Sequence, residues 1–156
     1  MLSVNTIYFS IALIILILVF LVSYLWQKQH QKYLHHQQGI GINLILQLRA
    51  LFRVLQQHRG LSQGILKGAS GLAQDRINIQ CEVDKQIAAF TCITQQQQFD
   101  LSKHGRWESI IEHWQRFSNT EQEISAENNL QQHNKLVLNT LDFIDDIASH
   151  CYLHQV

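Results

Sequence analysis

The chain has 156 residues, no proline and seven glycines, and it is rich in leucine, isoleucine and glutamine. This composition favours helices and leaves room for one soluble domain beside a membrane segment. Twelve basic side chains balance twelve acidic ones, and this neutrality argues against a protein that binds nucleic acid. No Asp or Glu precedes Asp75, however. We therefore expect a basic first helix that packs among acidic ones.

An apolar stretch near the N-terminus predicts a transmembrane helix. Residues 7–26 carry no charged side chain, and their number suffices to cross the hydrocarbon core of a lipid bilayer as a helix. No Lys or Arg precedes the stretch, which argues against a cleaved signal peptide. Lys28 and Lys32 follow it, so the positive-inside tendency places the soluble domain on the cytoplasmic side of the inner membrane. We expect a single-pass protein anchored through residues 1–27.

The remainder of the chain predicts an all-α fold. Residues 28–41 form a polar connector in which Gly39 and Gly41 suggest a bend. Apolar residues then recur at spacings of three and four, as in helices that pack in a bundle. This spacing predicts helices over about 42–67, 73–97, 107–117 and 130–151. The predicted architecture is an N-terminal transmembrane helix followed by an up-down-up-down four-helix bundle over residues 42–156.

A polar block interrupts the apolar face of the first bundle helix. The face consists of Leu44, Leu48, Leu51 and Leu55. The same spacing continues through His58 and Ser62, so two layers of the core are polar, and a neighbouring stripe turns Arg59 toward the interior or its edge. Buried polar groups must be satisfied. The guanidinium therefore needs either a carboxylate from another helix or an anion from solution.

The fourth helix carries a matching polar interruption. Its expected buried face consists of Leu130, Val137, Leu141, Ile144, Ile147, Ala148 and Cys151. His133 and Asn134 interrupt that face. If the first and fourth helices are antiparallel neighbours with Ile40 level with Leu153, Arg59 and Asn134 both lie nineteen residues further out, about 28 Å along the helices. The two polar layers then coincide.

Two partners for Arg59 remain open. The same count places Arg49 and Arg53 near the acidic residues Asp142, Asp145 and Asp146 but gives Arg59 no acidic partner on the fourth helix. Glu82 of the second helix comes close to its level and would form an ion pair. The start of the fourth helix lies near the same end, where its free N–H groups favour an anion.

The polar block resembles a motif of the nitrate- and nitrite-sensing domain family of bacterial receptors and regulators. The similarity covers about residues 43–153. The residues that carry it are Leu55-Gln56-Gln57-His58-Arg59-Gly60-Leu61-Ser62, Leu66-Lys67-Gly68, His133-Asn134-Lys135-Leu136, Ile144 and Ile147-Ala148.

The resemblance implies a helical bundle that binds nitrate or nitrite between helices through the Arg59-Gly60 step. A planar oxyanion matches a guanidinium fork, and a backbone without a side chain permits close approach. With the polar layer, the predicted ligand site consists of His58, Arg59, Gly60, Ser62, His133 and Asn134. Such sensors are commonly joined to output modules, whereas this chain ends at Val156. We therefore expect a signal to pass through a partner protein or the anchor, and the resemblance also allows a homodimer.

The cysteines and helix-end histidines suggest neither a disulfide nor a metal site. Cys81, Cys92 and Cys151 are odd in number and fit a reducing compartment as small buried residues. His150 and His154 have a spacing that suits metal ligands on one helix face, but no third ligand is evident. We predict no metal and no cofactor.

Two function classes follow, and neither is an enzyme, because no nucleophile and base pair, phosphate loop or paired carboxylates stand out. A ligand sensor requires that Arg59 lacks a carboxylate partner and borders a small polar cavity. A structural or interaction protein, such as a sensor that has lost its output, requires an ion pair between Glu82 and Arg59 and no cavity at that level.

Overall fold

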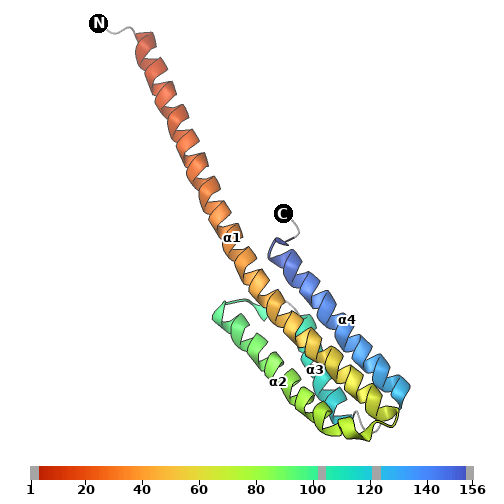
Figure 1. The fold of residues 1–156 in the computed structure, drawn as a ribbon. Coiled ribbons are helices and arrows are strands. Elements are labelled where there is room, and N and C mark those ends of the chain that lie inside the picture. Colours follow the sequence, from red (N-terminus) through yellow and green to blue (C-terminus); the bar gives the residue numbers. More distant parts are fainter. Residues whose placement is uncertain (1–3, 102–104, 121–123, 154–156) are drawn as a thin grey trace.

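The computed structural model describes residues 4–101, 105–120 and 124–153, and all regular structure within these ranges is helical (Figure 1). The described part contains four α-helices and one short 3-10 helix: α1 (Val4–Leu66), η1 (Ser70–Leu72), α2 (Ala73–Gln96), α3 (Gly105–Thr120) and α4 (Ala126–His150). The predicted all-α class is confirmed; α2, α3 and α4 begin and end close to the predicted residues, whereas α1 begins long before the predicted start at about residue 42.

The longest element, α1, runs without a break from the apolar segment into the packed helices. The bend predicted at Gly39 or Gly41 is wrong, because both glycines lie inside α1. Gly41 has a different role. A Cβ atom there would lie 2.5 Å from the Cβ of Cys151, so the missing side chain lets the end of α4 approach α1 closely.

The first half of α1 projects away from the other helices (Figure 1). Its apolar side chains from Leu13 to Leu25 are exposed, and by length and composition this part of the helix could cross a membrane. An apolar surface of this length is unfavourable in water and calls for a lipid or protein environment.

The second half of α1 packs against α2 and α4, and α3 packs against α4 (Figure 1). All four leucines predicted on its buried face are inside the core. On α4 the predicted face is partly wrong, because Leu130 and Leu141 are exposed whereas Thr140 and Phe143 are buried. The buried face of α4 therefore includes polar residues that form hydrogen bonds inside the protein. The Thr140 hydroxyl, for example, donates to the main-chain oxygen of Leu136 (2.8 Å).

Local signals mark two of the helix ends. Gly68 has a φ of +102°, which favours glycine, just after the end of α1. At the start of α4 the Ser125 hydroxyl accepts a hydrogen bond from the backbone N–H of Asn128 (3.3 Å). The cysteines are only partly as predicted, because Cys151 is buried but Cys81 and Cys92 are exposed.

Candidate functional site

The structure brings the predicted ligand-site residues together on facing turns of α1 and α4. Arg59 Nη1 donates a hydrogen bond to Asn134 Oδ1 at 2.9 Å, and His58 Nδ1 lies 2.9 Å from His133 Nε2. Four of the six residues are thus paired across two helices that are far apart in sequence. The predicted coincidence of the two polar layers is confirmed.

The two histidines form a closed pair inside the core. Both are fully buried. His133 Nδ1 lies 3.0 Å from the main-chain oxygen of Asn129, which can only accept, so this nitrogen carries the proton. In the neutral ring His133 Nε2 is then an acceptor, and His58 Nδ1 donates to it. Both ring nitrogens of His133 are therefore occupied by protein partners.

Neighbouring side chains enclose this pair. Gln63 Nε2 donates to Asn129 Oδ1 (3.1 Å) and to the main-chain oxygen of Ala126 (3.2 Å), which ties α1 to the start of α4. From α3, Trp114 meets the ring of His58 edge to face at 5.0 Å, and Phe117 meets the ring of His133 at 4.6 Å. Ser62 is also buried, one turn beyond His58. The layer is a structural element that joins α1, α3 and α4.

Arg59 lies at the edge of this layer with neutral partners. Its Nη2 donates to Gln56 Oε1 (2.8 Å), in addition to the bond with Asn134. The alternative ion pair with Glu82 is wrong, because Glu82 accepts from Gln86 Nε2 (2.8 Å) and pairs with Lys85 (3.6 Å). Among the described residues, no carboxylate lies within 4.0 Å of the Arg59 guanidinium. Among the described residues, the side chains that accept hydrogen bonds from this guanidinium are the neutral amides of Gln56 and Asn134.

Gly60 faces away from the layer, toward α2. It borders a cavity of about 470 Å³. The lining residues are Gln57, Gly60, Leu61, Asp75, Asn78 and Ile79. This cavity is not lined by Arg59 or by the two histidines, so it is not the small polar cavity that the sensor hypothesis requires. Among the described residues, the requirement of the sensor hypothesis that Arg59 lacks a carboxylate partner is met, and the ion pair with Glu82 that the scaffold hypothesis requires is not formed.

The acidic residues of α4 have another partner than the one expected. Arg106 Nε donates to Asp146 Oδ2 (2.7 Å), and Arg106 Nη1 donates to Asp142 Oδ2 (3.2 Å). These contacts raise the pKa of the Arg106 guanidinium. The expected pairing with Arg49 and Arg53 is wrong for these two carboxylates, because they lie one helical turn apart on the side of α4 that faces α3.

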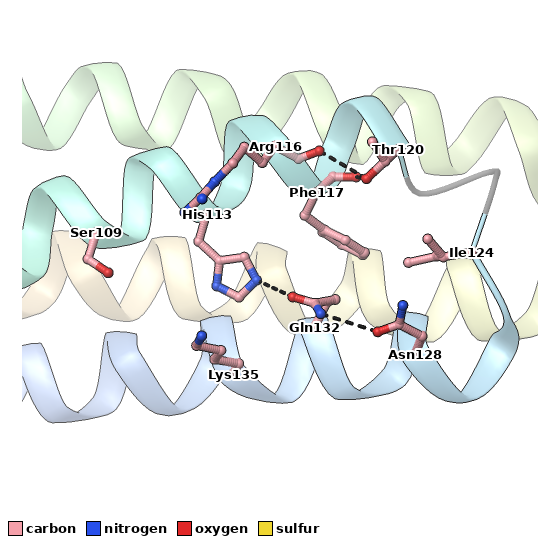
Figure 2. A pocket seen from close by; sticks show the side chains of 9 residues that line it. All are labelled: Ser109, His113, Arg116, Phe117, Thr120, Ile124, Asn128, Gln132 and Lys135. Carbon is pink, nitrogen blue, oxygen red and sulfur yellow. Dashed lines mark hydrogen bonds between the residues drawn. The ribbon is translucent and has the colours of Figure 1, made fainter.

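A cavity between α3 and α4 forms a second polar region, which the sequence analysis missed (Figure 2). Its volume is about 350 Å³. It is lined by Ser109, His113, Arg116, Phe117, Thr120, Ile124, Asn128, Gln132 and Lys135. A sequence signal for it exists, since His113 interrupts the buried face of α3 just as His133 interrupts that of α4.

His113 is the buried polar group of this cavity. It is 8% exposed, and its Nε2 donates to Gln132 Oε1 at 2.7 Å. Gln132 is held in turn, because its Nε2 donates to Asn128 Oδ1 (3.2 Å). Burial lowers the pKa of His113 below its ordinary value of 6.5, and the charges of Lys135 and Arg116 lower it further, whereas the bond with Gln132 opposes them. The ring therefore favours its neutral form.

Arginine and lysine carry the positive charges at the two polar regions, at Arg59 in the first and at Arg116 and Lys135 in the second. Among the described residues no three His, Cys, Asp or Glu side chains gather where they could hold a metal ion. His154, considered above as a partner of His150, lies outside the described residues.

Comparison of the chain with protein families, with curated proteins and with solved structures gave no match. The resemblance to the nitrate- and nitrite-sensing domain family therefore stays a prediction based on the motifs alone.

Proposed function

We propose that the protein is a non-catalytic, membrane-anchored sensory module that binds nitrate or nitrite at Arg59 and signals through a partner protein. In this proposal residues 7–26 cross the inner membrane once, and the packed helices form an up-down-up-down four-helix bundle on the cytoplasmic side. The exposed apolar half of α1 supports the anchor. The continuous helix from the anchor to the polar layer supports a route for the signal.

The observation that carries the anion proposal is the guanidinium of Arg59, which only neutral amide oxygens hold. A guanidinium has five N–H donors in a planar fork. Two of the donors are used by Asn134 and Gln56, so the others remain for an oxyanion of matching geometry. Gly60 leaves the adjoining backbone accessible, because no atom lies within 4 Å of where its Cβ would be.

The closed histidine pair favours a second candidate function, an anchored structural or interaction protein. His58 and His133 are fully buried and hydrogen bonded to each other, so the contact between α1 and α4 forms without a ligand. In this function Arg59 only fastens α1 to α4 through Asn134.

Calorimetric titration of the full chain in detergent micelles separates the two functions. Nitrate, nitrite and chloride are titrated into the parent protein, into Arg59→Gln and into the matched control Arg53→Gln, an exposed arginine of the same helix. The sensor function predicts saturable heat with nitrate or nitrite that Arg59→Gln loses and Arg53→Gln keeps. Absence of heat in the folded parent protein removes the sensor function and leaves the scaffold.

The exposed cysteines allow the membrane orientation to be tested. Cys81 and Cys92 are exposed, whereas burial of Cys151 raises the pKa of its thiol and makes it less reactive. In intact spheroplasts a membrane-impermeant maleimide should leave the protein unlabelled, and permeabilisation should allow labelling of the two exposed cysteines. A Cys81→Ser, Cys92→Ser variant is the control. Labelling of intact spheroplasts would place the packed helices outside.

A further inference from the structure

The cavity between α3 and α4 is lined by two cations, Arg116 and Lys135, for which the described residues provide no carboxylate partner. Arg116 uses its Nε to donate to the main-chain oxygen of Glu112 (3.2 Å). Among the described residues, neither Arg116 nor Lys135 has a carboxylate within 4.0 Å. Arg106, on the same face between the same two helices, contacts two carboxylates. Within the described residues, carboxylates thus compensate the charge of Arg106 at one end of this interface but not the charges of Arg116 and Lys135 at the other.

A buried atom inside the same cavity also lacks a partner. His113 Nδ1 is inaccessible to solvent and has no hydrogen-bond partner among the described residues. A buried polar atom without a partner is unfavourable by about 1–3 kcal/mol. Figure 2 shows His113 reaching from α3 toward α4, with Lys135 beside it and Phe117 further along the cavity. The unpartnered nitrogen and the two uncompensated cations therefore line one space.

The far end of the cavity is less polar, because Phe117 and Ile124 line it. A volume of about 350 Å³ lies within the range of roughly 300–1,000 Å³ that is usual for small-molecule sites. The lining thus combines a cationic end with an apolar end, and its described residues include no carboxylate.

We propose that this cavity is a second anion-binding site, which takes an oxyanion headgroup attached to a short apolar body, such as an organic sulfonate or phosphate ester. The headgroup lies between Arg116 and Lys135 and accepts a hydrogen bond from His113 Nδ1. The apolar body packs on Phe117 and Ile124. This site is separate from the one proposed at Arg59, since the two share no residue.

The tautomer of His113 gives the site a distinctive property. Because Nε2 donates to Gln132, the neutral ring presents a lone pair at Nδ1, which can accept but not donate. The charged groups that act on the ring are Arg116 on α3 and Lys135 on α4. An anion placed between these cations offsets their repulsion and favours a proton on Nδ1. An anion without a proton of its own therefore binds together with one proton taken from the buffer.

The test is calorimetry on the full chain in non-ionic detergent micelles with two sulfonates that do not titrate near neutral pH. Benzenesulfonate offers the headgroup and a ring, and methanesulfonate offers the headgroup alone. Heats measured in two buffers of different ionisation enthalpy report proton uptake, and titration into micelles without protein is subtracted. We expect saturable binding of benzenesulfonate that is at least about tenfold tighter than that of methanesulfonate. Above the pKa of His113, the Kd of benzenesulfonate should increase by a factor that approaches about ten for each pH unit.

Four variants assign the effect to the cavity. Lys135→Gln should weaken binding by about tenfold or more, and His113→Gln should abolish proton uptake. Lys85→Gln, an exposed lysine of α2, and Arg59→Gln should bind like the parent protein. Circular dichroism checks that each variant is folded. Absence of saturable benzenesulfonate binding at about pH 6, or equal affinity of Lys135→Gln and Lys85→Gln, would overturn the proposal without affecting the one at Arg59.

Discussion

Gln132 and His133 are neighbours on α4, yet they belong to regions of opposite character. His133 faces α1, where its Nε2 contacts His58; its Nδ1 contacts Asn129 of α4 itself, and no surface of the side chain is exposed. Gln132 faces α3, where it contacts one ring nitrogen of His113; the other ring nitrogen is buried without a hydrogen-bond partner among the described residues. Burial is similar in the two histidines, so it does not distinguish their roles. The two side chains differ in the second ring nitrogen, which contacts the main-chain oxygen of Asn129 in His133 and has no hydrogen-bond partner among the described residues in His113.

The largest expected effect is the loss of the closed pair in His133→Ala. This variant removes the hydrogen bonds to His58 and Asn129 together with the ring contact to Phe117. We expect the free energy of unfolding to fall by about 3 kcal/mol, since a buried cavity and unsatisfied groups result. Urea unfolding in micelles, followed by circular dichroism, measures this. The matched control is Asn134→Ala, an exposed neighbour, which should lose less than about 1 kcal/mol.

A smaller loss is expected at the open site. His113→Ala removes one hydrogen bond, that with Gln132, and enlarges a space that is already accessible. We expect a decrease of about 1 kcal/mol in the free energy of unfolding, measured as above. A loss as large as that of His133→Ala would contradict the distinction between the two histidines.

The pH dependence of stability sharpens the comparison. Burial holds the pKa of His113 in the fold below the 6.5 of an ordinary histidine. Between the two pKa values of His113, the unfolded chain therefore binds more protons than the folded chain. His113 thus lowers the free energy of unfolding as the pH falls below about 6.5, and this decrease levels off below the pKa of His113 in the fold. His113→Gln should flatten the stability profile between about pH 6.5 and pH 5. An unchanged profile in this variant would show that His113 is as readily protonated in the fold as outside it.

The smallest effect on stability is expected for Arg59→Gln. The side chain is only partly buried, and its partners are neutral amides of Gln56 and Asn134. We expect a change below about 1 kcal/mol. Thermal melts of Arg59→Gln and His133→Ala, measured side by side, compare a residue at the edge of the polar layer with one at its centre. A loss of stability comparable to that of His133→Ala would mean that Arg59 stabilises the polar layer as much as His133 does, as a scaffold function requires.

The sequence allowed the helices and one polar contact to be predicted. Spacings of three and four residues located the buried leucines of α1, because a helix that buries one face must repeat its apolar residues at that period. Counting along two helices placed Arg59 level with Asn134, and the two side chains are hydrogen bonded. Such counting works because the helical rise is constant.

Other features could not be predicted, because they depend on which of several acceptable partners a side chain meets. Glycine usually weakens a helix, so a bend at Gly41 was expected, but contact with the end of α4 keeps the helix continuous. Arg106 and Arg49 are equally basic, and only the position of α3 gives Asp142 and Asp146 to Arg106. His113 was overlooked because its aromatic neighbours on α3 indicated a core face.

α1 is one continuous helix from the apolar segment to the packed helices. Its 63 residues span roughly 95 Å at a rise of 1.5 Å per residue. Neither a proline nor a hinge lies between the apolar half and the turns that carry His58 and Arg59. The polar layer and the apolar half therefore lie on one continuous hydrogen-bonded helix, with no loop between them.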